Sequence, residues 1–440
     1  MSFPAYPEYK DSGVEWLQEI PSGWSATRVK YLASTISGGT PDTDNSSYWS
    51  EEEGATPWVS IGDMSSRDEV WNTAKSLTEL GRRSKGLQLG SSGTIVFAMY
   101  ASVGEVSILR IPAVWNQALL GFEVDNEMCL DRFLFYNLKT IRGYLPHLYR
   151  SNTQNNLNAD QVENLPVALP SLTEQQAIAD FLDRETAKID ALIGKQEQLI
   201  ATLREERSAI VDSVLDSHGF TAPRALSDVQ SWQLPIGWRI IRLGTVLRQL
   251  TNGFVGPTRD ILVDEGIPYI QSTHIKQGRI DFARRPFYVR KEWHDARPRI
   301  HLRQGDVLIV QTGDIGKVAV VPADFGDASC HALQIARVKP EILSGHYLGT
   351  FLSSHLGFHS LRSLATGALH PHLEAGVRAA PIVVPPLEVQ TLVIREVDDR
   401  TAQIDSVIAK SQKMIETLRE YRSALITDAV TGKIDVRGAA

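Results

Sequence analysis

The amino-acid sequence predicts an α+β protein built as an internal repeat, in which two β-rich domains are each followed by a long coiled-coil helix. The segment TLREERSAIV at residues 202–211 returns as TLREYRSALI at residues 417–426. Apolar residues recur around both segments at steps of three and four, which is typical of a long helix with one apolar stripe. Short β-like runs bounded by glycine lie in the stretches that precede the two segments.

The repeat extends well beyond this one segment. At an offset of 215 residues, residues 169–215 align without a gap with residues 384–430. Upstream, IPSGW at residues 20–24 returns as LPIGW at residues 234–238, and weaker echoes follow in both domains. Because a repeated stretch of sequence folds as a repeated structural unit, each half is expected to contain one globular domain and one helix.

Each long helix is predicted to need a helical partner. The first is expected to begin just after Pro170, where Thr173-Glu174-Gln175-Gln176 resembles a capping box. About 43 residues at a rise of ~1.5 Å give a helix of roughly 65 Å. A stripe of period near 3.5 over about five heptads indicates coiled-coil packing, and the sister helix is the obvious partner. The apolar positions of the predicted seam are Ile178, Leu182, Ile189, Leu192, Leu199, Leu203, Ile210 and Val214 in the first helix, and Val393, Val397, Ile404, Val407, Met414, Leu418, Leu425 and Ala429 in the second.

The globular parts are predicted to be mixed α+β domains. TIVF at residues 94–97 and DVLIV at residues 306–310 are short strand-like runs bounded by glycine. Gly90-Ser91-Ser92-Gly93 and the pair Asn252-Gly253 supply turn residues between such runs.

Composition favours an ordinary globular protein of the cytoplasm. Hydrophobic residues are 42% and charged residues 22% of the chain, and the net charge is −7. Cys129 and Cys330 have no CxxC partner, so neither a disulfide framework nor a zinc site is expected. No signal peptide opens the sequence, and no apolar run approaches the roughly 20 residues that span a bilayer, so no membrane association is expected. The charge is uneven: residues 237–340 carry 16 Lys and Arg against 10 Asp and Glu.

Three motifs together resemble a known family. They are the opening YKDSGVEWLQEIPSGW, the block LPSLTEQQAIADFLDRETAKIDALI and the ending ALITDAVTGKIDVR. In combination, and across essentially the full length, they are similar to the DNA-specificity subunit of type I restriction–modification systems. One departure from the family pattern is Val389, which stands before Gln390 where the family usually has Glu.

The resemblance implies a function in DNA recognition. Such subunits carry two target-recognition domains, each reading one half of a split double-stranded DNA sequence in the major groove. Two antiparallel helices between them, related by a pseudo-two-fold repeat, set the spacer and dock two modification (methyltransferase) subunits. Those partners bind S-adenosylmethionine and methylate adenine, and a restriction (translocase) subunit uses ATP, with magnesium also expected on the partner subunits. The chain itself is expected to bind no cofactor and to catalyse nothing.

The resemblance also suggests domain boundaries. The predicted parts are a first target-recognition domain at 1–165, a first long helical region at 166–218, a second target-recognition domain at 219–380, a second long helical region at 381–432, and a C-terminal tail at 433–440.

Sequence motifs for catalysis are not found. An adenine methyltransferase needs an Asn/Asp-Pro-Pro-aromatic loop, and the nearest string, Asn164-Leu165-Pro166-Val167, lacks the second proline and the ring. A translocase needs a glycine-rich phosphate loop ending in Gly-Lys-Ser/Thr, and Thr431-Gly432-Lys433-Ile434 fails at its last position. His370-Pro371-His372 lacks a nearby third metal ligand, so no metal site is predicted. Because Asn155-Asn156-Leu157 aligns with it at an offset of 215, base recognition suits this position better.

Candidate DNA-binding residues are amide, hydroxyl, imidazole and basic side chains in predicted loops and near strand ends. They are Arg82, Arg83, Lys85, Arg150, Asn152, Gln154, Asn155, Asn156, Gln271, Thr273, His274, Lys276, Arg284, Arg285, Gln311, Thr312, His370 and His372. Candidate partner-binding residues are the charged faces of the two helices, namely Arg204, Glu205, Arg207, Arg419, Glu420 and Arg422. The alternative function is a non-enzymatic coiled-coil adaptor with two protein-binding domains. Similar helices beside divergent domains favour two DNA readers over an adaptor.

Overall fold

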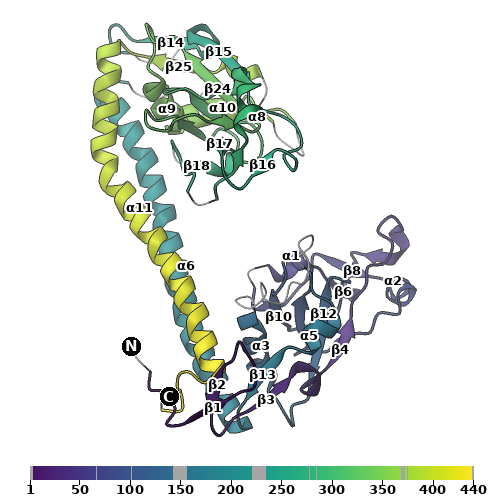
Figure 1. Cartoon of the computed structure of the whole chain (residues 1–440). Helices are drawn as coiled ribbons and strands as arrows, with labels where there is room; N and C mark the ends of the chain where they lie inside the picture. The colour runs from purple at the N-terminus through teal and green to yellow at the C-terminus, as the bar shows by residue number, and fades with distance from the viewer. Residues whose placement is uncertain are drawn as a thin grey trace. The chain divides into compact units, whose positions relative to one another are not determined.

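The computed structural model (Figure 1) describes residues 3–65, 67–100, 102–141, 156–220, 234–276, 278–283, 285–367, 372–373 and 375–438. The chain divides into two compact units. Unit 1 comprises residues 1–195 and 414–440, and unit 2 comprises residues 196–413. Each unit therefore contains one globular domain and parts of both long helices.

Unit 1 is built on a five-stranded sheet of order β4 (Ala33–Ser37), β12 (Leu119–Val124), β9 (Ile95–Ala98), β10 (Val106–Leu109) and β7 (Glu69–Val70). A second sheet has the order β11 (Val114–Trp115), β6 (Thr56–Val59), β8 (Lys75–Leu77) and β5 (Trp49–Ser50). Two-stranded pairs join β1 (Tyr9–Asp11) to β2 (Glu19–Pro21) and β3 (Ser25–Arg28) to β13 (Pro166–Leu169). The short helices are η1 (Val29–Tyr31), η2 (Ser46–Tyr48), α1 (Ile61–Met64), α2 (Glu79–Ser84), α3 (Asp131–Thr140) and α5 (Ala159–Glu163).

Unit 2 repeats this plan. Its main sheet has the order β15 (Leu247–Asn252), β24 (Leu333–Val338), β21 (Val307–Val310) and β22 (Val318–Val320), and its second sheet the order β16 (Leu262–Val263), β20 (Tyr288–Val289), β17 (Ile267–Ile270) and β23 (Ser329–Cys330). Pairs join β14 (Arg239–Arg242) to β25 (Pro381–Val384) and β18 (Ile275–Lys276) to β19 (Arg279–Ile280). The short helices are α7 (Leu243–Val246), η5 (Ser272–His274), α8 (Lys291–Asp295), η6 (Pro298–Ile300), α9 (Gly345–Ser353), α10 (His355–Arg362) and η7 (Ala375–Ala379). Both the predicted α+β class and the predicted repeat are confirmed.

The two long helices are α6 (Leu172–Ser217) and α11 (Leu387–Val430). In unit 1 the start of α6 shares a hydrophobic core with the end of α11, since Ile178 and Leu425 belong to one cluster. In unit 2 the end of α6 shares a core with the start of α11, as Val214 and Val397 show. The two helices therefore run antiparallel within each unit, as predicted. In the described part of the chain, neither these nor any other helix is long and apolar enough to cross a membrane.

The predicted seam is wrong in the middle of both helices. Leu192, Leu199, Val407 and Met414 are 40–51% exposed. Their neighbours are buried instead, namely Ile200, Ile408, Ser411 and Ile415. An α-helix has 3.6 rather than 3.5 residues per turn, so its buried face drifts away from a strict seven-residue repeat. The sequence pattern did not reveal that drift.

A buried glutamine explains why the repeat conserves Gln175 and Gln390. The Gln175 amide accepts the N–H of Leu130 at 2.8 Å and donates to the carbonyls of Met128 and Pro170 at 3.2 and 3.1 Å. Gln390 makes the equivalent bonds, accepting the N–H of Ser344 at 2.8 Å and donating to the carbonyls of Ile342 and Pro385 at 3.0 and 2.8 Å. Each glutamine thus fixes the start of α3 or α9 against the first turn of a long helix. Despite Val389, α11 begins where α6 does in the repeat.

Both chain ends pack into unit 1. The Tyr9 hydroxyl donates to the carbonyl of Gly432 at 3.0 Å, and the N–H of Asp435 donates to the carbonyl of Pro4 at 2.7 Å. Val436 is buried in the same core as Tyr6. The N-terminal segment and the residues after α11 are therefore part of the first domain's packing.

Candidate nucleic-acid interface

In both units, one strand of the main sheet ends against a leucine from a distant segment. The N–H of Leu157 donates to the carbonyl of Met99, just after β9, at 3.0 Å. The N–H of Leu373 donates to the carbonyl of Gln311, just after β21, at 2.8 Å. Both leucines are buried in their cores. Each therefore anchors the residue before it, Asn156 or His372, at the end of a central strand.

This anchoring corrects the alignment of the two halves. The offset of 215 residues placed Asn155 opposite His370, whereas the shared bond of Leu157 and Leu373 places Asn156 opposite His372. A one-residue difference in length between the halves accounts for the shift.

In unit 2, two candidate residues come together at this point. The Thr312 hydroxyl lies 2.7 Å from Nδ1 of His372. The backbone of His372 exchanges hydrogen bonds of 2.7 and 3.0 Å with Thr366, and the Gln334 amide donates to the carbonyl of Leu373 at 2.8 Å. Thr312 is exposed and His372 is half-buried. A ring held at Nδ1 keeps Nε2 for one further hydrogen bond, as a donor or an acceptor according to its tautomer.

The equivalent place in unit 1 carries different groups. Tyr100 follows β9 as Thr312 follows β21, and 37% of its surface is exposed. Asn156, which is half-buried, takes the place of His372. An amide can bond adenine at two atoms, whereas an imidazole nitrogen makes one bond to a base edge. The two units thus present different polar groups on the same frame.

Other residues predicted to contact DNA make hydrogen bonds within their own domains. His274 is 1% exposed; its Nδ1 accepts the N–H of Gln271 at 2.9 Å, and its Nε2 lies 2.8 Å from the carbonyl of Arg285. Burial lowers the pKa of His274, so the ring is neutral. The side chain of Gln311 is also buried. In unit 1, Arg82 donates twice to Glu79, at 2.9 and 3.0 Å.

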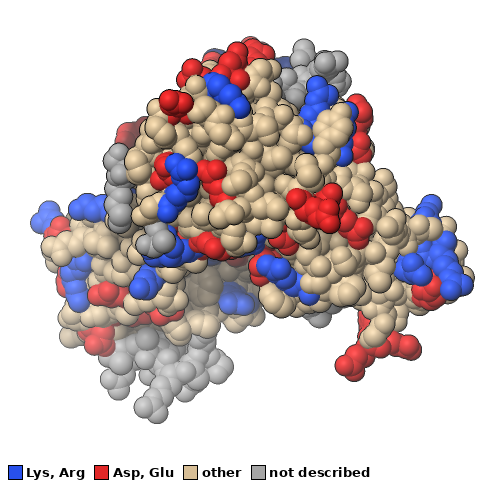
Figure 2. All heavy atoms as spheres, turned by 90° about the horizontal axis from the view of Figure 1, so that it is seen from below, with Lys and Arg blue, Asp and Glu red and all other residues tan. Residues whose placement is uncertain are grey.

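The remaining candidates are distributed over the surface or lie outside the described residues. Those that are exposed are Arg83, Lys85, Thr273 and Arg285, and those that are half-buried are Gln271 and Lys276. Those outside the described residues are Arg150, Asn152, Gln154, Asn155, Arg284 and His370. Figure 2 shows Lys and Arg interspersed with Asp and Glu on the face it draws. The positive charge on that face therefore lies in small separate groups.

Two predicted partner-binding arginines make ion pairs within the units: Arg207 joins α6 to α11, and Arg422 joins α11 to α6 and to the first domain. Arg207 donates to Asp405 at 3.0 Å. Arg422 pairs with Asp68 at 2.9 Å and with Asp190 at 3.0 Å. Lys139 also pairs with Asp68. Both arginine side chains are less than one-fifth exposed. Of the other candidates, the exposed ones are Arg204, Glu205, Arg419 and Glu420.

The sequence pattern did not predict the apolar side chains that are exposed on the long helices. They recur at equivalent positions of the repeat, in the pairs Leu172 and Leu387, Leu192 and Val407, and Leu199 and Met414. Sequence alone assigned the last two pairs to the seam, so the useful signal was the mismatch between the 3.5-residue pattern and the helical period of 3.6.

Metal binding has no support in the described ranges. Cys129 and Cys330 are buried and free. Within those ranges, no group of three or more His, Cys, Asp or Glu side chains is placed to hold a metal ion.

Comparison with known proteins finds one family model and several relatives that resemble this chain. The type I restriction modification DNA specificity domain matches residues 21–201. The MjaIX specificity subunit of Methanocaldococcus jannaschii is 22% identical over 442 residues, covering 98% of this chain and 97% of its own length. Over nearly its whole length, the chain is therefore similar to type I restriction–modification specificity subunits. The EcoBI specificity subunit of Escherichia coli is 24% identical over 341 residues, covering 73% of this chain and 70% of its own length.

The fold of this chain also occurs in a solved structure. That structure, titled as the structural basis of complex assembly and conformational transition of a type I R-M system, aligns with a TM-score of 0.55 at 18% identity. The alignment covers 94% of this chain and 99% of the solved chain. At this identity the likeness shows a shared fold.

Proposed function

We propose that each globular domain reads one half of a bipartite double-stranded DNA target. The observation that carries this proposal is the shared anchor with different side chains. In both units a buried leucine bonds to the carbonyl that follows a central strand, while the polar residues beside it differ: Tyr100 and Asn156 in unit 1, Thr312 and His372 in unit 2. Two readers of different sequences need a common scaffold and different recognition groups.

The Thr312–His372 pair is suited to reading a base edge. A ring fixed at Nδ1 has little freedom, so Nε2 would meet a base at a defined place. As a donor it would bond N7 or O6 of guanine, and as an acceptor it would take the amino group of cytosine or adenine. A well-placed contact of this kind discriminates between bases by about 1–3 kcal/mol.

We propose further that α6 and α11 dock two methyltransferase subunits. The exposed apolar pairs Leu192 and Val407, and Leu199 and Met414, recur at equivalent places of the repeat. Apolar side chains that recur together on a surface mark an interaction site. Since the same pattern occurs twice, it suits two copies of one partner. The adaptor alternative has no comparable observation in its favour.

The rest of the complex follows from this assignment. S-adenosylmethionine would bind to the methyltransferase subunits, and a restriction subunit that binds ATP and magnesium would join through them. Both long helices begin in one unit and end in the other, so we propose that they set the spacer between the half-sites. We also propose that the complex works on DNA in the cytoplasm.

The test is to replace His372 by asparagine and map methylation in cells that carry the complete system. The proposal expects one position of one half-site to change while the other half-site stays as in the wild type. If the recognised sequence were unchanged in both halves, His372 would not be a reader. If the chain failed to bind DNA with its partner subunits, the adaptor function would become the better assignment.

A further inference from the structure

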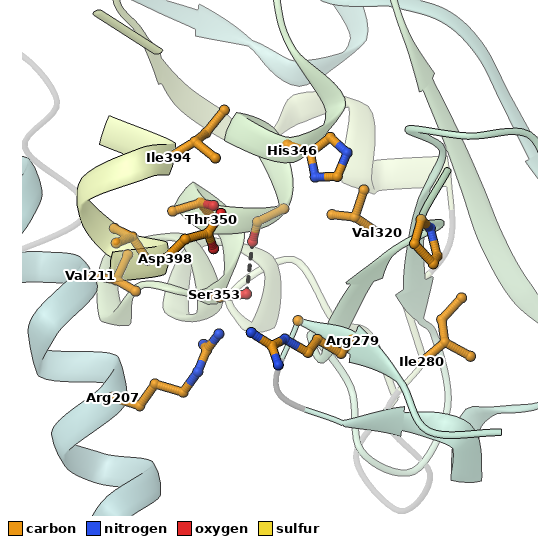
Figure 3. A pocket seen from close by; sticks show the side chains of 14 residues that line it. Arg207, Val211, Arg279, Ile280, Val320, His346, Thr350, Ser353, Ile394 and Asp398 are labelled. Carbon is orange, nitrogen blue, oxygen red and sulfur yellow. Dashed lines mark hydrogen bonds between the residues drawn. The ribbon is translucent and has the colours of Figure 1, made fainter. Parts of the chain in front are cut away.

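A cavity of about 410 Å³ lies in unit 2 where α9 and β19 face the long helices (Figure 3). Its polar lining consists of Arg207, Arg279, His346, Thr350, Ser353 and Asp398. In Figure 3 the guanidinium groups of Arg207 and Arg279 point toward one another. Arg207 belongs to α6, Arg279 to β19 and Asp398 to α11, so three separate elements contribute charge to one cavity.

Unit 1 shows the equivalent aspartate bonded by side chains of this chain itself. Because Gln175 and Gln390 bond the residues before α3 and α9 in the same way, these two helices correspond residue by residue. Arg132 then corresponds to His346, and Tyr136 to Thr350. The repeat of the long helices makes Asp183 correspond to Asp398.

In unit 1 the aspartate is fully engaged. Asp183 accepts from Nε of Arg132 at 2.7 Å and from the hydroxyl of Tyr136 at 2.5 Å. The Arg132 guanidinium also lies 5.3 Å from the centre of the Tyr136 ring. A guanidinium and a phenol from α3 therefore occupy the place that is open in unit 2.

In unit 2 the groups that would reach the aspartate are absent. Thr350 is far shorter than tyrosine and His346 is shorter than arginine, while Gly349 and Ser353 replace Phe135 and Lys139. Asp398 lies in α11 and is exposed, and among the described residues its carboxylate has no hydrogen bond or ion pair. Its carboxylate lines the cavity without a partner there.

The charged groups at the cavity are balanced, and one carboxylate among them, that of Asp398, has no basic partner in the described part of the chain. Arg207 and Arg279 both bind Asp405, at 3.0 and 2.7 Å, so the two guanidiniums share a carboxylate already. Asp398 supplies a further negative charge. A carboxylate bonds most strongly to a charged donor, and a guanidinium matches its geometry best.

We propose that this cavity is a socket for an arginine side chain of the methyltransferase subunit docked on the helices in unit 2. The proposal rests on the proposed function, which supplies that partner. The incoming guanidinium would bond Asp398 as Arg132 bonds Asp183. In unit 1 a cavity of about 760 Å³ remains beside the helices, but it does not include Asp183, which already bonds Arg132 and Tyr136. The two docked copies would therefore be held by unequal contacts although the helices repeat.

The test measures how many methyltransferase subunits bind to the full-length chain, and how tightly. We expect Asp398→Asn to weaken one of the two binding events at least tenfold, because a lost charge-assisted hydrogen bond is worth about 1.5–3 kcal/mol. Asp399→Asn removes the same charge one residue away, at a position that does not line the cavity, and should leave both events unchanged. Thr350→Tyr should fill the socket and give the same selective loss. Thermal unfolding of each variant is compared with the wild type.

The outcomes separate this inference from the function on which it rests. If Asp398→Asn and Thr350→Tyr bind both copies as tightly as Asp399→Asn does, the socket is overturned while the docking of two subunits stands. If Asp398→Asn weakens only DNA binding, the cavity contributes to DNA binding and not to subunit docking, and the socket is again overturned. If the wild-type chain binds no methyltransferase subunit at all, the proposed docking fails, and the socket fails with it.

Discussion

Replacing Gln175 by leucine is expected to destabilise unit 1 by roughly 3–6 kcal/mol. The buried amide bonds three backbone groups, those of Leu130, Met128 and Pro170. Leucine is of similar size but would leave all three unpaired in the interior, at about 1–3 kcal/mol each, and its own apolar burial would offset part of that cost. A loss of this size is a large share of the ~5–15 kcal/mol that stabilises a typical protein.

Urea unfolding of the wild type and the variant measures the loss, and hydrogen exchange shows where it falls. Protection should decrease in α3 and at the start of α6, both in unit 1, with a smaller effect in unit 2. Gln176→Leu is the matched control, because Gln176 is exposed and its amide bonds only Asp180 on the same helix. Gln390→Leu should produce the mirror effect in unit 2. A loss of stability below about 1 kcal/mol for Gln175→Leu would refute the proposal that the Gln175 amide holds the start of α3 against α6.

Three further predictions follow from the structure. Burial lowers the pKa of His274, His294 and His331, so below pH ~6.5 the unfolded chain binds more protons than the folded chain. Unit 2 should therefore lose up to about 1.4 kcal/mol per pH unit for each histidine between pH 6.5 and the lower folded-state pKa, measured as urea midpoints from pH 7.5 to 5.5. Thr312→Val removes the hydroxyl that holds His372 and should weaken discrimination at one base of one half-site about tenfold, measured by methylation mapping. Four residues inserted after Gln198 add ~6 Å of helix, close to one or two base pairs, and should lengthen the spacer while leaving both half-sites unchanged.

Each of these has a result that would contradict it. A flat dependence of the unit 2 midpoint on pH would mean that the three histidines titrate alike in the folded and unfolded chain. If Thr312→Val kept the base preference of the wild type, the Thr312 hydroxyl would have no role in base recognition. An active insertion variant that methylates at the original spacing would falsify the proposal that the helices set the spacer.

The sequence predicted the repeat and the long helices because these depend on patterns along the chain. Residues 169–215 and 384–430 align without a gap, and the helices α6 and α11 begin at equivalent residues. The strands β9 and β21 also lie where short apolar runs predicted them. The helix seam was only partly predictable. A pattern of period 3.5 assigned Leu192 and Leu199 to the core, while the helical period of 3.6 exposes them.

The candidate site could be predicted by residue type but not by contact. His274 and His372 are both polar residues near strand ends, and sequence gives no reason to separate them. Tertiary packing does, because Phe282 and the backbone around Arg285 enclose His274, while Leu373 anchors His372 beside the exposed Thr312. Likewise, the ion pairs of Arg207 and Arg422 join groups that are distant in sequence, so both arginines were predicted to face a partner.

The central claim is that the two domains read separate half-sites, and exchanging the first domain tests it most directly. Residues 25–165 are replaced by the equivalent domain of a type I specificity subunit, and the methylated positions of the genome are mapped by sequencing. We expect one half of the recognised sequence to change to that of the donor while the other half and the spacer stay as they were. A change in both halves, or in neither with methylation intact, would contradict the claim.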